Sequence, residues 1–179
     1  MLFELQPTLE NEMVRIQPLM AADFEILFAL ASDPLVWEQH PNKNRYQQKE
    51  FENYFEGAIK SGGAFLVSSI QTGETIGSSR FYDFNEKDKT VFIGYTFFGI
   101  SYWNGQFNPA LKALMLNHAF QFVDTVLFHV GAQNIRSQKA MEKLGAEKVR
   151  EEEVAYYNES SRLNYVYKID KQMWMKNVT

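Results

Sequence analysis

The stretch from Tyr95 to Gly145 constrains the fold of this chain more than any other. Its apolar pattern and its turn residues predict a strand ending at Phe98, a tight polar loop, a helix opening at Asn108-Pro109, a strand over Val126–Val130 and a helix over Ile135–Leu144. A helix between two strands is a crossover, which parallel strands need and antiparallel strands do not. We therefore expect a pair of parallel neighbours inside a mixed sheet.

The junction before the first of these helices has the composition of an anion site. Asn108 is predicted as the N-cap and Pro109 as the first helical residue. Gly105, just ahead, would let the backbone approach a ligand closely. Free N–H groups and the positive end of the helix dipole favour a bound anion there. Many strand-to-helix turns look alike and bind nothing, and the loop alone favours that interpretation.

The helix expected over Ile135–Leu144 has signals at both ends. Asn134 is predicted as its N-cap, and Gly145 follows its last turn, where a left-handed residue commonly ends a helix. Ser137, Met141 and Leu144 recur at i, i+4 and i+7, so they share one side of the helix.

Two strings in this stretch resemble motifs of one enzyme family. Asn134-x-x-Ser137, followed by Glu-Lys-Leu-Gly145, resembles the last motif of the GNAT superfamily of N-acetyltransferases, in the branch of ribosomal-protein N-terminal acetyltransferases. Ile93-Gly94-Tyr95-Thr96-Phe97, followed by Ser101-Tyr102-Trp103-Asn104-Gly105, looks like the central strand and pyrophosphate loop of that branch. The similarity extends from about Met13 to Arg150. The two motifs are fairly specific together, and neither is specific alone.

The remaining pattern agrees with the fold that the resemblance implies. Helices are predicted over Ala21–Ala31, after the Asp33-Pro34 cap, and from Phe51 to Ile59 with an end at Gly62. Further strands are predicted at Val14–Ile16, Ala64–Ile70, Thr75–Asp83, Val91–Phe98, Glu147–Tyr156 and Asn164–Asp170. We expect one α/β (α+β) domain over residues 1–179, with a mixed, mostly antiparallel sheet of about seven strands and helices on both faces.

Composition excludes several classes of protein. A hydrophobic content of 45% is enough for a packed core, so the chain is not disordered. A formal charge of −4 without a basic run argues against a nucleic-acid partner. The lack of cysteine excludes thiolate metal sites, and the three histidines lack metal-ligand spacing, so no metal is expected. The sequence shows neither a signal peptide nor an apolar run of membrane-spanning length. We expect a cytoplasmic protein, monomeric or homodimeric, with no membrane partner.

The resemblance implies a set of residues that bind acetyl-coenzyme A. The pyrophosphate loop aligns with six positions, and the central strand adds three more: Trp103, Asn104, Gly105, Gln106, Phe107 and Asn108, with Thr96, Phe97 and Phe98. Gln106 replaces a family glycine, and Asn108 replaces a small residue. A side chain at Gln106 restricts positive φ there. Asn134 matches the asparagine that contacts the pantetheine arm, and it could also be an ordinary N-cap.

The catalytic machinery departs from the family pattern. Ser137 matches a serine that some relatives place near the coenzyme sulfur, although a polar residue in a first helical turn is the simpler interpretation. A tyrosine that serves as general acid in other branches is Met141 here, and a common glutamate base is Phe92. Asp83, Glu86 and His129 could substitute as the base. The thioester carbonyl would be polarised by a backbone N–H of the strand from Tyr95 to Phe98.

Four residues are candidates for binding the acceptor. Trp37 and His40 lie in the segment that covers the acceptor cleft in relatives, and Arg80 and Tyr82 share one face of a strand. Each has a simpler interpretation as packing or turn chemistry. His118 is expected to be a hydrogen-bonded core histidine. Glu151, Glu152 and Glu153 are expected to form a solvated strand edge.

Three functions remain open from the sequence. The favoured one is an enzyme that transfers the acetyl group of acetyl-coenzyme A to a primary amine by direct attack in a ternary complex. Its acceptor would be a small molecule or a protein N-terminus. The second is a non-catalytic acyl-coenzyme A sensor or scaffold, supported by Phe92 and Met141. The third is a purely structural interaction protein, which the paired motifs disfavour.

Overall fold

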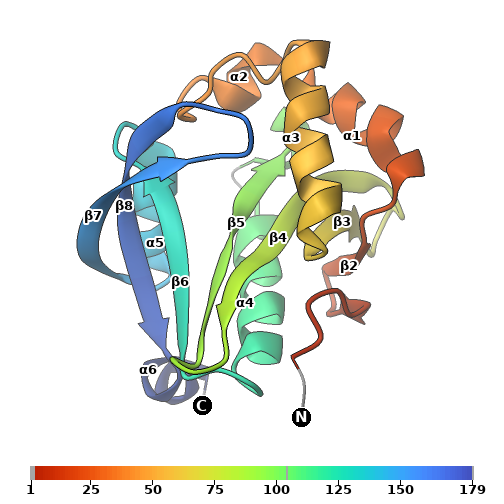
Figure 1. Cartoon of the computed structure of the whole chain (residues 1–179). Coiled ribbons are helices and arrows are strands. Elements are labelled where there is room, and N and C mark those ends of the chain that lie inside the picture. Colours follow the sequence, from red (N-terminus) through yellow and green to blue (C-terminus); the bar gives the residue numbers. More distant parts are fainter. Residues whose placement is uncertain (1–2, 104, 179) are drawn as a thin grey trace.

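The computed structural model describes residues 3–103 and 105–178 as a mixed eight-stranded sheet with helices on both faces (Figure 1). The strands are β1 (Leu9–Glu10), β2 (Val14–Pro18), β3 (Ala64–Ser69), β4 (Thr75–Asn85), β5 (Thr90–Phe98), β6 (Thr125–Gly131), β7 (Glu147–Ala155) and β8 (Ser161–Asp170). The helices are α1 (Phe24–Ala31), α2 (Pro34–Trp37), α3 (Gln48–Ser61), α4 (Phe107–Ala119), α5 (Ile135–Lys143) and α6 (Lys171–Val178), with 3₁₀ turns at Ala21–Asp23 and Ile100–Tyr102.

The strand order is β1-β2-β3-β4-β5-β6-β8-β7, and β5 with β6 is the parallel pair. This confirms the predicted fold class and the predicted crossover. The sequence did not predict the two-residue β1 or α6. The edge position of β7 is confirmed as well, and its exposed glutamates are typical of strands that avoid pairing with another chain.

Most of the residues that were predicted to begin or end a helix do so in the structure. The Asp33 side chain accepts a hydrogen bond of 2.9 Å from the backbone N–H of Leu35 at the start of α2. Gly62 ends α3 in the left-handed conformation, with φ of +63°. Asn134 caps α5 by accepting 3.1 Å from the N–H of Ser137. Such caps satisfy backbone groups that have no partner inside the helix.

The predicted start of α4 is wrong by two residues. Helix α4 begins at Phe107 with Gln106 as its N-cap, so Asn108 is the second helical residue. Ala110 N–H already donates to the Gln106 carbonyl at 2.9 Å, which places the first turn earlier than expected. Pro109 still fits, because the N–H groups of the first helical turn have no intrahelical partner. The side chain of Asn108 is therefore free of a capping role.

Two apolar cores lie on opposite faces of the sheet. Strand β3 supplies both by alternation, since Phe65 and Val67 join the core under α4, α5 and α6, while Ala64 and Leu66 join the core under α1, α2 and α3. Burying a large apolar side chain contributes about 1.5–3 kcal/mol. The sheet is thus held from both faces, which keeps the central strands in fixed positions.

A bulge in β5 reverses the alternation of that strand. Ile93 packs in the α4-side core, and Phe97, four residues later, packs in the opposite core. The ladder with β4 shifts register between Ser78 and Arg80, opposite the bulge. At this point Tyr95 has φ of +53°, a conformation uncommon for a residue with a side chain. An extra residue in one strand moves later side chains to the other face and bends the strand.

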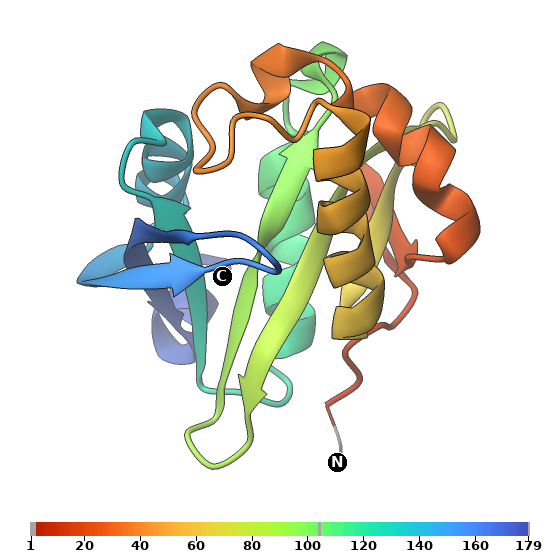
Figure 2. The ribbon, with the colours of Figure 1, turned by 45° about the horizontal axis from the view of Figure 1, so that its top comes forward.

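Strands β5 and β6 pair only at their beginnings. Their register runs from Thr90 opposite Thr125 to Phe92 opposite Leu127. Beyond that point β6 remains paired with β8 up to Gly131, and β5 remains paired with β4. Figure 2 shows the two strands diverging from their shared lower end. The bulge at Tyr95 lies in the diverging part.

Candidate active site

A cavity of about 250 Å³ lies where β5 and β6 separate. Its lining includes residues 93–98 of β5 and 128–131 of β6, together with side chains from α4 and α5 and from the loop after α2. The lining comes from segments far apart in the chain, and the divergence of the two strands brings them together.

A buried lysine lies at the α4 side of this cavity. Lys112 is 4% exposed, and its Nζ donates a hydrogen bond of 2.7 Å to Thr96 Oγ1 on β5. The Thr96 hydroxyl also hydrogen-bonds with that of Ser79 at 2.8 Å. Burial lowers the pKa of Lys112 to about 7, because the charged ammonium has lost its hydration. This residue places a titratable cation next to the bulged strand.

An open groove continues from the cavity between the N-terminus of α4 and α5. Its described lining includes four cations and no Asp or Glu, and the cations are Lys112, Arg136, Lys139 and Lys143. Gln106 and Asn108 lie at its other wall, at the N-terminus of α4, where the helix dipole is positive. Such a groove fits a ligand that carries several phosphates.

Arg136 joins the elements around the mouth of the cavity. Its guanidinium lies 4.0 Å from the centroid of the Trp103 ring, and its Nη2 donates 3.2 Å to the carbonyl oxygen of Val36. Its backbone N–H donates to Gln39 Oε1 at 3.0 Å. The start of α5 is thereby attached both to α2 and to the loop that follows β5.

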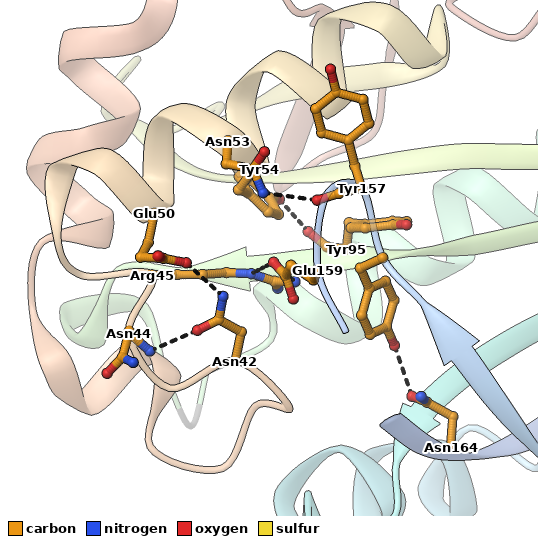
Figure 3. A network of polar contacts seen from close by, with 11 residues as sticks. Asn42, Asn44, Arg45, Glu50, Asn53, Tyr54, Tyr95, Tyr157, Glu159 and Asn164 are labelled. Atoms are coloured by element: carbon orange, nitrogen blue, oxygen red, sulfur yellow. Dashed lines mark hydrogen bonds and ion pairs between the residues drawn. The ribbon is translucent and has the colours of Figure 1, made fainter. Parts of the chain in front are cut away.

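The other end of the cavity is covered by the loop after α2 and the β7–β8 hairpin. Arg45, which is 3% exposed, pairs with Glu159 at 3.0 Å (Figure 3). Its guanidinium also lies among the rings of Trp37, Tyr54 and Tyr156. The hairpin is also held by Asn53 Nδ2, which donates 2.8 Å to the Tyr157 carbonyl on the same side (Figure 3). Aromatic rings around a paired cation give this end an apolar, fixed cover.

Two histidines line the cavity in different surroundings. His40 is held near Arg45 and Arg136, and burial together with these two cations lowers its pKa to about 3. It is therefore neutral at physiological pH. His129 instead contacts Tyr82, whose hydroxyl lies 2.9 Å from His129 Nδ1.

The comparisons with known proteins identify the fold family. Residues 14–147 match the family model described as Acetyltransferase (GNAT) domain. The chain belongs to the GNAT acetyltransferase family. No sequence among the curated proteins matches it.

Solved structures with this fold agree along nearly the whole chain. A GCN5-related N-acetyltransferase from Brucella melitensis is 18% identical with a TM-score of 0.80, covering 95% of this chain and 81% of that one. RimJ from Mycobacterium smegmatis, in complex with CoA-disulfide, is 16% identical with a TM-score of 0.68, covering 89% and 82%. Spermidine N-acetyltransferase from Vibrio cholerae, in complex with CoA and spermine, is 15% identical with a TM-score of 0.70, covering 92% and 99%. At these identities the likeness concerns the fold.

The GNAT cavity brings together most of the residues singled out in the sequence. Its lining includes Tyr82, Tyr95, Thr96, Phe97, Phe98, Trp103, Gly105, Asn108, Asn134, Ser137 and His40. Gln106 lines the adjoining groove. Phe107 instead packs against the α4-side core, with its ring edge-on to Tyr102 at 5.8 Å. Asn104 lies outside the described residues.

Trp37 and Arg80 lie behind the cavity surface. Trp37 is 1% exposed in the core under α1–α3, and its Nε1 donates 2.7 Å to the Ala31 carbonyl. Arg80 is 4% exposed, and its guanidinium lies 3.9 Å from the centroid of the Tyr95 ring. Both residues support lining side chains. Neither is part of the lining that the described residues form.

Several residues that line the cavity were not singled out in the sequence. Lys112 follows Asn108 by one helical turn, which is a weak signal for a shared face. Arg45 and Arg136 lie in loops or helix starts with no motif that marks them. His118, by contrast, was predicted correctly as a satisfied core histidine, since it is 8% exposed and its Nε2 lies 2.9 Å from the Glu4 carbonyl.

The described residues include no group of three or more His, Cys, Asp and Glu that could hold a metal ion. Within residues 3–103 and 105–178, no helix has the length and apolar character needed to span a membrane.

Proposed function

We propose that this GNAT enzyme transfers the acetyl group of acetyl-coenzyme A to a primary amine by direct attack in a ternary complex. The observation that carries the proposal is the cavity at the bulge of β5, where that strand has left its ladder with β6. A backbone N–H of Tyr95–Phe98 would polarise the thioester carbonyl as negative charge develops on its oxygen. Holding both substrates side by side supplies much of the rate.

The basic groove supports the choice of cofactor. The described lining of the groove has four cations and no carboxylate, and it lies beside a helix N-terminus. Such a surface fits the phosphates of coenzyme A. Residues Trp103–Asn108 would hold the pyrophosphate, as the family resemblance implies. Asn134 would contact the pantetheine arm, with Thr96, Phe97 and Phe98 along its other side.

Two side chains are placed to assist the departing thiolate. Ser137 lies in the first turn of α5 and lines the cavity, and its hydroxyl would strengthen a hydrogen bond as charge develops on the sulfur. Lys112, beside Thr96, would add a cation from the α4 side. Met141, which lines the same wall, supplies no proton.

The charge of the cavity favours an acceptor with a single amine. Its described lining contains Arg45, Lys112 and Arg136 but no Asp or Glu. A polyamine carries several cations that would meet these groups, and like charges repel. Glu159, which lies outside the lining, is already paired with Arg45 at 3.0 Å. We therefore favour an amine on an otherwise neutral or anionic molecule, such as an amino acid or a peptide N-terminus. His40 and Tyr82, which line the cavity, would contact it.

Release of coenzyme A over a panel of amines tests this proposal. Purified protein should release coenzyme A from acetyl-coenzyme A with amino-acid amides or peptides more efficiently than with spermidine. Acetyl-coenzyme A, but not adenosine, should raise the melting temperature, since a ligand that binds only the native state stabilises it.

The alternative is a sensor without turnover. A shift in melting temperature together with no coenzyme A release over the whole panel would favour it. The absence of any shift at millimolar acetyl-coenzyme A would contradict the cofactor assignment for both functions.

A further inference from the structure

The acceptor amine must give up one proton, and the side chains named above leave it without an acceptor. Lys112 donates to Thr96 Oγ1 at 2.7 Å and is assigned to the departing thiolate. An amine acceptor is protonated at neutral pH and must lose a proton before its nitrogen can attack. The described cavity lining has no carboxylate, and the arginines beside His40 keep that imidazole neutral with a pKa of about 3. His40 therefore cannot accept the proton. The other histidine of the lining has different neighbours.

His129 lies in the middle of a chain of three titratable side chains. Its Nδ1 is 2.9 Å from the hydroxyl oxygen of Tyr82, and its Nε2 is 2.5 Å from Glu152 Oε1. A carboxylate accepts hydrogen bonds, so Nε2 carries the imidazole proton and donates it to Glu152. Nδ1 is then the acceptor of the Tyr82 O–H. This tautomer leaves the lone pairs of the Tyr82 oxygen available to a donor in the cavity.

The surroundings keep these three side chains in one arrangement. Phe92 stacks on the His129 ring with centroids 4.2 Å apart, and the second oxygen of Glu152 accepts 2.9 Å from Arg150 Nε on β7. Gly94 leaves room for the Tyr82 ring, since a Cβ there would lie 3.1 Å from the Tyr82 hydroxyl oxygen. Phe92 occupies the position where the family resemblance would have a glutamate.

Four charged or titratable side chains influence the Tyr82 hydroxyl, namely Tyr95, Tyr156, Asp83 and Arg80. Burial has a larger effect than any of them and raises the pKa of Tyr82 well above its ordinary value. Tyr82 is thus a neutral hydroxyl at working pH. It can pass a proton only if a neighbour accepts its own.

The three hydrogen-bonded side chains connect the cavity with the solvent. Tyr82 and His129 line the cavity, and the His129 side chain is only 7% exposed. The Glu152 side chain, at the other end, is 33% exposed. His129 lies on β6 and Glu152 on β7, and β8 lies between these two strands. The contact between the two side chains therefore depends on the strand order. A proton that reaches Glu152 is at the solvent boundary.

We propose that Tyr82, His129 and Glu152 form a relay that carries the proton of the acceptor ammonium from the cavity to solvent, a role that rests on the proposed acetyl transfer. The ammonium gives a proton to the Tyr82 oxygen while the Tyr82 O–H proton moves to His129 Nδ1. His129 becomes an imidazolium beside the Glu152 carboxylate, and its Nε2 proton leaves through Glu152 to water. The neutral amine then forms its N–C bond as the C–S bond breaks. Its second proton ends on the coenzyme A thiol, which balances the reaction.

Two amine probes of similar size separate the relay from a packing role. Methylamine is protonated at neutral pH and methoxyamine is not, so only the first needs the relay. For His129→Gln we expect kcat/KM with methylamine to fall about 100-fold at neutral pH, the scale of general-base catalysis. The loss should shrink at alkaline pH, where methylamine loses its own proton. With methoxyamine the variant should stay within about threefold of the wild type.

Glu152→Gln should show the same selective loss for methylamine. Tyr82→Phe also changes the acceptor site, so it should lower both rates and lower the methylamine rate more. His118→Gln is the matched control, because His118 is similarly buried and lies in the core on α4. It should leave the ratio of the two probe rates unchanged. The shift in melting temperature caused by acetyl-coenzyme A should be the same in all these variants and the wild type.

The tautomer of His129 can be measured in the wild-type protein without turnover, so this test does not depend on the folding of a variant. Nitrogen NMR of the wild-type protein should show His129 with Nε2 protonated and Nδ1 accepting, and Tyr82→Phe should shift the Nδ1 resonance. Equal losses with both probes, an unchanged pH profile in His129→Gln, or the opposite tautomer would each overturn the relay. No coenzyme A release by the wild type with any amine, despite a cofactor-induced shift, would instead overturn the proposed transferase function.

Discussion

The hydroxyl of Tyr54 donates a hydrogen bond of 2.6 Å to the carbonyl oxygen of Tyr95. Tyr54 lies on α3, and Tyr95 is the bulged residue of β5 with φ of +53°. A left-handed conformation at a residue with a side chain costs about 1–3 kcal/mol and persists only where its surroundings hold it. The contact therefore attaches the strained part of β5 to the helix layer.

Replacing Tyr54 with Phe should loosen this bulge. The Tyr95 carbonyl would lose its partner in a buried setting, at a cost of about 1–2 kcal/mol in the free energy of unfolding. We also expect a lower kcat, since the backbone N–H groups of the bulge would be less well aligned. Urea unfolding and steady-state kinetics measure the two effects. Tyr46→Phe is the control, because its hydroxyl contacts the exposed Gln47 side chain. Equal effects of both substitutions would contradict the role of the Tyr54 contact.

Lys112→Met should raise stability while lowering activity. The folded protein holds Lys112 with a pKa of about 7, and the unfolded chain has a pKa near the ordinary value of ~10.4. Between these values the unfolded chain binds more protons, so wild-type stability should rise with pH through this window. The variant should lack that dependence and should be the more stable of the two proteins at acidic pH. Lys49→Met, on the exposed face of α3, should change neither stability nor kcat.

The two asparagines at helix starts should differ in their effect on stability. Asn134→Ala removes a cap and should cost about 1 kcal/mol. Asn108→Ala removes no cap and should stay within about 0.5 kcal/mol of the wild type. Both line the cavity, so both should weaken acetyl-coenzyme A binding in calorimetry. A stability loss at Asn108 similar to that at Asn134 would contradict the observed start of α4.

Ser137→Ala should lower kcat by tenfold to a hundredfold, or about 1.4–2.7 kcal/mol of transition-state stabilisation. The Ser137 hydroxyl is not needed by the Asn134 cap, which uses the backbone N–H. Affinity for acetyl-coenzyme A should therefore change little. An unchanged kcat with a good acceptor would remove Ser137 from the mechanism. A large loss of cofactor binding would make it a cofactor-positioning residue.

The features that could be predicted from the sequence are those that depend on neighbours along the chain. Asp33, Gly62 and Asn134 act within one helical turn, so their spacing alone predicts the helix boundaries. The strand–helix–strand passage required a crossover, which the parallel β5–β6 pair confirms. The start of α4 was misplaced because Asn108-Pro109 also fits the second and third helical positions.

Tertiary structure alone decided the features that join distant residues. His129 meets Glu152 because β8 lies between β6 and β7 in a particular register, and a slip of one residue would turn Glu152 to the other face. Lys112 has a lowered pKa because the sheet and α4 exclude water from it. The bulge at Tyr95 depends on a two-against-one pairing with β4 and on Tyr54 from α3. Local propensity carries no information on such contacts, since their energy arises only when the whole sheet has formed.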